Sequence, residues 1–96
     1  MKYDEIENVK EVIGYIESTY NQHYVGIDTD GTQVLDLLHS IGIAETFCQA
    51  NAIKYATRFG RKNGKDKKDL LKAIHYILLL MYFSENNNNG EISNED

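Results

Sequence analysis

Proline is absent from this chain of 96 residues, and cysteine occurs only once, as Cys48. A single cysteine excludes an intramolecular disulfide framework and a cysteine-rich zinc site, so a reducing, cytoplasmic setting fits best. Long hydrophobic runs are lacking too, because the longest, residues 76–83, falls far short of the roughly 20 residues that a membrane-spanning helix needs. Residues 1–11 are acidic without an apolar core, so we expect neither a signal peptide nor a membrane partner.

Positive charge is scarce overall but concentrated in one segment. The chain has 10 Lys and Arg against 15 Asp and Glu, a net charge of -5, which argues against a binder of bulk nucleic acid. Residues 54–72 hold eight of the ten basic residues and only two acids, a net charge of +6. Focused charge of this kind raises the local concentration of an anionic ligand. The segment therefore predicts a site for a localised anion.

Apolar residues recur at helical spacing, and the missing proline leaves the helices uninterrupted. The pattern predicts an all-α fold, a compact bundle of about four helices. Residues 21–31 contain two glycines and an Asp-Thr-Asp run and are predicted to form a loop. The first helix is expected at residues 3–20, with a core-facing stripe of Ile6, Val9, Ile13, Ile16 and Tyr20.

The other helices are predicted from their boundary residues. A short helix begins at Thr32 and stops before Gly42, which is a usual C-terminal signal. A third helix spans residues 44–58, and a fourth runs from an N-cap at Asp66 to about residue 83. The residues of the third helix that we expect to face the core are Phe47, Ala50, Ile53 and either Ala56 or Ala52.

The C-terminal half of the fourth helix is apolar on almost every side, through Tyr76, Leu79, Leu80, Tyr82 and Phe83. Such a helix must be covered all round. Either its own chain wraps it, or it lies in the interface of a homo-oligomer, which we expect because an uncovered patch promotes aggregation. Residues 1–83 are predicted to form a single helical domain. Residues 84–96, rich in Asn and acids, are predicted to form a disordered tail.

Several donors of the basic segment share one face of the third helix. Asn51, Lys54, Tyr55 and Arg58 follow the spacing i, i+3, i+4, i+7, and we expect Arg58 to be exposed. Arginine offers a planar fork for phosphate oxygens, and lysine a movable charge. Tyr55 could stack on a base, and Asn51 could bind a base edge or a ribose. The predicted phosphate-binding residues are Asn51, Lys54, Arg58, Arg61, Lys62, Lys65 and Lys72.

Other features have weaker support. Residues 60–65 (GRKNGK) do not form a GxxxxGK[ST] phosphate loop, since no strand precedes them, and the segment could instead be a solvated turn. No cluster of His, Cys and acids has the spacing of a metal site.

Cys48 is interpreted as a small core residue, and His39 and His75 are interpreted as structural or exposed residues. His23 and Tyr24 could line a site or simply pack.

Three motifs in order resemble a small phage-borne domain family. They are HY at residues 23–24, NxxKYxxRxGxK at residues 51–62 and DLxKAxxY at residues 69–76. The resemblance covers about residues 22–82, and a coliphage nucleotide kinase without a Walker motif is related to this family. It implies a nucleotide partner and adds His23, Tyr24, Tyr55 and Tyr76 as residues that would contact a base or ribose. The chain lacks the longer N-terminal extension of that kinase.

Three functions remain open at this point. The first is a nucleotide-binding protein that sequesters its ligand, for example a host signalling nucleotide, in the cytoplasm of a phage-infected cell. The second is a deoxynucleoside monophosphate kinase, in which Asp69 or His23 would orient a metal, with Mg²⁺ as the possible cofactor, or the attacking oxygen. The third is a protein-binding module that uses the basic segment and the apolar helix. We expect the first.

Overall fold

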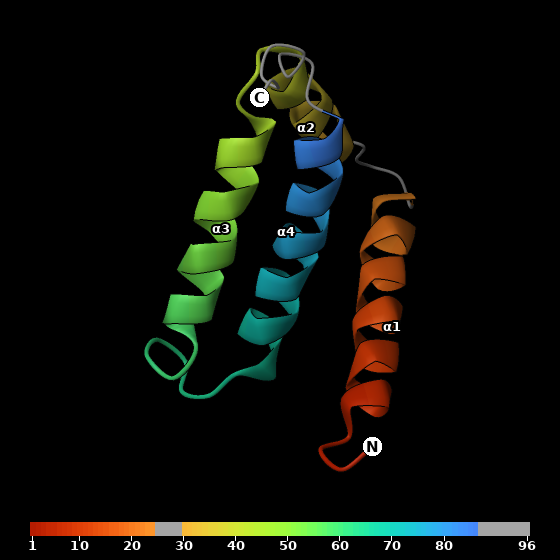
Figure 1. Cartoon of the computed structure of the whole chain (residues 1–96), viewed down its shortest axis with the longest axis vertical. Helices are drawn as coiled ribbons and strands as arrows, with labels where there is room; N and C mark the ends of the chain where they lie inside the picture. Colours follow the sequence, from red (N-terminus) through yellow and green to blue (C-terminus); the bar gives the residue numbers. More distant parts are fainter. Residues whose placement is uncertain (25–29, 87–96) are drawn as a thin grey trace.

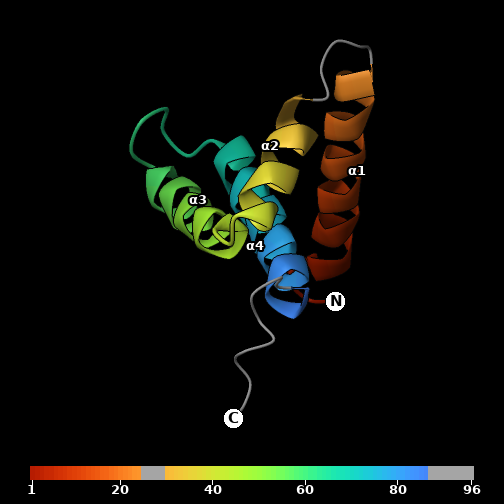
Figure 2. The same ribbon diagram turned by 90° about the horizontal axis from the view of Figure 1, so that it is seen from above.

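The computed structural model describes the backbone of residues 1–24 and 30–86 and the side chains of residues 1–20 and 34–86. It contains four helices, α1 (Glu5–Tyr24), α2 (Asp30–Ser40), α3 (Ala44–Arg58) and α4 (Lys67–Glu85), and no strand in these ranges. The predicted all-α fold is therefore confirmed. α3 and α4 pack side by side, α1 lies on the other side of α4, and α2 packs against α3 (Figure 1, Figure 2).

The predicted loop between the first two helices is shorter than expected. α1 continues to Tyr24 and α2 begins at Asp30, so residues 21–24 and 30–31 belong to helices rather than to the loop. Residues 21–24 contain neither glycine nor proline and nothing to stop the helix. The prediction took Gly26 and Gly31 as marks of a loop, but Gly31 lies within α2.

The boundaries of α3 and α4 agree with the sequence prediction. The Asp66 side chain caps α4, because its Oδ1 accepts a hydrogen bond of 2.9 Å from the backbone N–H of Lys68. Between the helices, Gly60 and Gly64 both have positive φ, +85° and +69°, and the Gly60 N–H donates to the Gly64 carbonyl at 2.8 Å. The basic residues of this segment are thereby held on a tight turn between two helix ends.

Small side chains make most of the core between α3 and α4. The buried apolar residues are Ala44, Cys48, Ala52, Ala73 and Phe83. Cys48 has no exposed surface, which confirms its interpretation as a core residue. Of the two alternatives Ala52 and Ala56, Ala52 is the buried one, whereas Phe47 is only half-buried and the expectation fails for the exposed residues Ala50 and Ile53. The reason is that α3 turns its smallest residues to α4 so that the two helices approach closely.

The stripe expected to anchor α1 in the core lies largely outside it. Ile6, Val9, Ile13 and Tyr20 are all exposed, by 44% to 53% of their surface. α1 instead turns towards the rest of the molecule an adjacent row of half-buried residues, including Tyr15 and Thr19. The prediction was wrong because α1 has two apolar rows, and the one richer in aliphatic residues is the uncovered one.

α4 is covered on two of its sides. Towards α3 and α2, its residues Tyr76, Leu79 and Leu80 pack against the core cluster of Ala44, Cys48 and Phe83. Towards α1, its His75 meets Tyr15. The side that faces away from the pocket residues is exposed at Leu70, Ile74, Ile77, Leu78 and Met81. The expected covering on every side is thus not provided by the described part of the chain. None of the described helices is long and apolar enough to cross a membrane. Ser84 and Glu85 belong to α4 rather than to a tail, while residues 87–96 lie outside the described ranges.

We expect Phe83→Ala to lower the free energy of unfolding by about 3 kcal/mol, because it leaves a cavity in a core with only one large buried apolar side chain among the described residues. Urea unfolding followed by circular dichroism measures this. Ile53→Ala is the matched control and should stay within about 0.5 kcal/mol of wild type, since Ile53 is 60% exposed. Equal losses in the two variants would contradict the described core.

Candidate functional site

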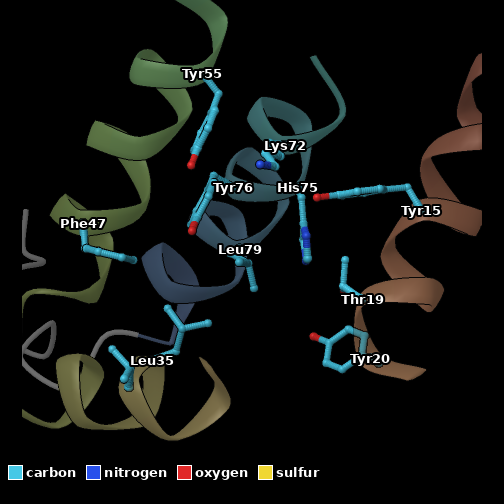
Figure 3. Close-up of a pocket in the computed structure, with 11 residues that line it drawn as sticks. Tyr15, Thr19, Tyr20, Leu35, Phe47, Tyr55, Lys72, His75, Tyr76 and Leu79 are labelled. Carbon is cyan, nitrogen blue, oxygen red and sulfur yellow. The ribbon is translucent and has the colours of Figure 1, made fainter. Parts of the chain in front are cut away.

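A pocket of about 490 Å³ opens where the four helices meet (Figure 3). α1 and α4 supply most of its walls, α3 supplies two aromatic residues, and α2 closes one end. The pocket exists because α1 stands away from the close α3–α4 pair. Its lining residues are Tyr15, Thr19, Tyr20, Val34, Leu35, Phe47, Tyr55, Lys72, His75, Tyr76 and Leu79.

Aromatic rings flank the pocket on two sides. On one side Tyr55 and Tyr76 are stacked, with an angle of 2° between their planes and 6.0 Å between their centroids. On the other side Tyr15 meets His75 edge to face, also at 6.0 Å (Figure 3). Flat π-faces of this kind stack on nucleobases with little regard to base identity. The space between the two groups of rings is therefore suited to a planar aromatic ligand.

Two lysines bring positive charge to the same rings. The Nζ atoms of Lys54 and Lys72 each lie 5.1 Å from the centroid of Tyr55, a cation–π geometry. Lys72 lines the pocket beside the rings. Lys54, on α3, is exposed and does not line the pocket. An aromatic slot with an ammonium group at its edge matches a ligand that joins a flat ring to an anionic group.

Arg58 and Asp69 form an ion pair next to these residues, one turn closer to the basic turn. Arg58 Nε lies 3.4 Å from Asp69 Oδ1. Asp69 is buried and the Arg58 side chain is 29% exposed, so the expectation of an exposed Arg58 is wrong. Neither Arg58 Nε nor Asp69 Oδ2 has a hydrogen-bond partner among the described residues. Neither residue lines the pocket, and the carboxylate holds the arginine within the helix pair.

The other predicted site residues lie further away. Arg61, Lys62 and Lys65 are exposed on the turn between α3 and α4 and do not line the pocket. Asn51 donates from Nδ2 to the carbonyl of Phe47 at 2.9 Å, which engages its amide within α3. His23 belongs to the last turn of α1 with Tyr24, and their side chains lie outside the described residues.

Several lining residues were not predicted from the sequence. His75 is half-buried and lines the pocket in addition to its packing against Tyr15. On α4, Lys72, His75, Tyr76 and Leu79 follow i, i+3, i+4, i+7, a spacing that was visible in the sequence. Tyr15 and Thr19 likewise share one face of α1, but nothing in the sequence indicated that this face, rather than the aliphatic row, turns inward.

Burial determines the protonation states of the titratable side chains that line the pocket. Desolvation lowers the pKa of His75 below its usual 6.5. It also raises the pKa values of Tyr15 and Tyr76, and nearby Tyr55 adds to both increases. Above pH 6.5 the imidazole is therefore neutral, and at neutral pH these two tyrosines keep their protons. Lys72 is then the charged group among the described lining residues, so the pocket favours an anion.

The described residues contain no group of three or more His, Cys, Asp or Glu placed to hold a metal ion. Asp69, the carboxylate expected to orient a metal in a kinase, instead points its Oδ1 at Arg58.

The sequence matches one family over residues 2–78, from the start of the chain to near the end of α4. The chain belongs to this family, which is described as a protein of unknown function, DUF3310. The match includes every described residue of the pocket except Leu79. No curated protein and no solved structure matches the chain.

Arg58→Met should lower the free energy of unfolding by about 2 kcal/mol, because it leaves the Asp69 carboxylate buried without a counter-charge. The expected loss of unfolding free energy is smaller than for a fully buried ion pair, because Arg58 is partly exposed. Adding Asp69→Leu should recover part of the loss, and urea unfolding of both single variants and the double variant measures the coupling. Arg61→Met is the exposed control. Additive losses would show that the pair is not coupled.

The lowered pKa of His75 predicts a pH dependence of stability. The unfolded state takes up a proton at this residue near pH 6.5, while the folded state resists it until lower pH. Its contribution to stability is therefore present above pH 6.5 and falls as the pH drops from 6.5 to the folded-state pKa. His75→Gln should reduce the difference in urea midpoint between pH 7.5 and pH 5.5. An unchanged difference would contradict the burial of the imidazole.

Proposed function

We propose that this protein binds a nucleotide in the pocket and sequesters it. The base lies between the Tyr55–Tyr76 pair and the Tyr15–His75 pair, and the phosphates lie at Lys72 and Lys54. The observation that carries the proposal is the combination in one cavity of stacked aromatic rings with an ammonium group at their edge. The volume of about 490 Å³ lies within the range of small-molecule sites in proteins.

The surrounding charge supports a ligand with phosphates. Lys54 and Lys72 belong to the segment of net charge +6, which continues from the pocket to the turn at Gly60 and Gly64. A phosphate group at Lys72 would be attracted by the exposed Arg61, Lys62 and Lys65 without direct contact. These three residues then act as an attracting surface, and Lys54 and Lys72 act as the contact residues.

Sequestration is favoured over catalysis by the position of Asp69. A phosphoryl-transfer site needs carboxylates free to hold magnesium, together with room for a second nucleotide. Asp69 is buried and paired with Arg58. The resemblance of the three sequence motifs to the phage domain family supports the nucleotide ligand, and its kinase relative makes deoxynucleoside monophosphate kinase the alternative. A phage-encoded sequestering protein would act on a signalling nucleotide in the host cytoplasm.

Lys72→Met should weaken nucleotide binding by tenfold or more, because it removes a charge-assisted contact worth about 1.5–3 kcal/mol. Isothermal titration with nucleoside mono-, di- and triphosphates and with cyclic oligonucleotides identifies the ligand and measures Kd. Lys65→Met is the matched control, a lysine removed from the exposed turn, and should change Kd by no more than about twofold. Equal effects of the two variants would mean that the ligand meets the turn and not the pocket.

The same experiment separates the alternatives. Incubation of the wild-type protein with the bound nucleotide, ATP and Mg²⁺, followed by chromatography, should return the nucleotide unchanged. New diphosphate in excess over the protein would establish the kinase instead. Absence of binding across the whole panel would overturn the nucleotide proposal and favour a protein-binding module.

A further inference from the structure

An uncovered apolar stripe runs along α4 on the side away from its pocket-lining residues. It consists of Leu70, Ile74, Ile77 and Met81, which follow i, i+4, i+7, i+11. Their exposed fractions are 37%, 38%, 46% and 54%. Alternating steps of four and three residues are the spacing of a helix–helix seam, where apolar residues of one helix insert between those of another. The stripe has the pattern of a packed face although the described chain leaves it open.

The ends of the stripe carry opposite charges. Lys67 lies in the first turn of α4 and Glu85 in its last, 18 residues apart, which is five helical turns and places both on one line. Each charge is unfavourable in its own helix, because the lysine is at the positive end of the dipole and the glutamate at the negative end. Lys67 has Glu11 as an ion-pair partner at 2.9 Å.

We propose that a second copy of this chain covers the stripe, with the two α4 helices packed antiparallel about a two-fold axis. In this arrangement Leu70 meets Met81 of the partner subunit and Ile74 meets Ile77 of the partner subunit. The two-fold axis makes the stripe complementary to itself, so each contact occurs twice. The proposal is independent of the proposed nucleotide function.

Charge selects the antiparallel orientation over the parallel one. Antiparallel packing places Lys67 near Glu85 of the partner subunit and near the negative end of the partner's helix dipole. Each charge that is unfavourable in its own helix is then favourable in the pair. Parallel packing would instead place Lys67 beside the partner's Lys67 and Glu85 beside the partner's Glu85.

The dimer leaves the pocket open. α4 contributes Lys72, His75, Tyr76 and Leu79 to the pocket, and none of these belongs to the stripe. Each copy therefore keeps a complete pocket formed by its own four helices.

The first test is the mass of the protein in solution. Light scattering should give the wild type twice the chain mass, and Ile77→Lys, which places a charge within the seam, should give the mass of one chain. Ile53→Lys is the matched control, since it changes an exposed isoleucine on α3 and should leave the dimer intact. A wild type with the mass of one chain, or an unchanged mass for Ile77→Lys, would overturn the proposal.

The second test fixes the orientation. An equimolar mixture of Leu70→Cys and Met81→Cys chains should form a disulfide between the two chains on mild oxidation, whereas Leu70→Cys alone should not. Wild type is the control, because Cys48 has no exposed surface. Efficient self-linking of Leu70→Cys would overturn the antiparallel arrangement. Ile77→Lys should bind the wild-type ligand with unchanged Kd, so the dimer and the nucleotide site can fail separately.

Discussion

The close approach of α3 to α4 is the constraint on which the rest of the structure depends. Alanines and Cys48 at the contact allow the two helices to pack tightly, and Phe83 closes the end of the contact. Small residues bury little apolar surface each, so this pair cannot supply a large hydrophobic core. The other two helices consequently pack around it more loosely, and much of the aliphatic surface of α1 and α4 stays outside. A tight pair with a small core thus accounts both for a pocket beside α4 and for an uncovered stripe behind it.

The packing of α3 against α4 positions both the pocket residues and the basic turn. Because α3 and α4 are antiparallel and joined by a short turn, residues far apart in the sequence lie opposite each other, as Tyr55 does with Tyr76. The ion pair of Arg58 and Asp69 stands between this aromatic layer and the turn. The pair engages the Arg58 guanidinium and leaves its side chain only 29% exposed. Lys54 and Lys72, whose Nζ atoms each lie 5.1 Å from the centroid of the Tyr55 ring, bring positive charge to the aromatic layer instead.

Helix boundaries and side-chain positions differ in how far the sequence predicts them. Asp66, Gly42, Gly60 and Gly64 mark their boundaries through local backbone chemistry, which does not depend on the rest of the fold. Which face of a helix is buried depends on its neighbours, and α1 shows the difficulty, because its aliphatic row is exposed whereas the row with Tyr15 and Thr19 is half-buried. The sequence predicted Lys54 and Lys72 as phosphate-binding residues from their place in the basic segment, and the structure brings both close to the Tyr55 ring. His75 could not be placed in a pocket, since the pocket wall opposite it comes from a helix about 60 residues earlier.

The two proposals use opposite sides of α4 and draw on different physical terms. Nucleotide binding would depend on stacking and on a few lysine charges, so it would weaken with salt. Packing of α4 against a second α4 would depend on apolar burial, which salt does not screen, with Lys67 and Glu85 setting orientation more than strength. A single 19-residue helix would then hold a ligand on one face and a partner on another. Such a division would account for the apolar C-terminal half of α4, which the described chain covers only in part.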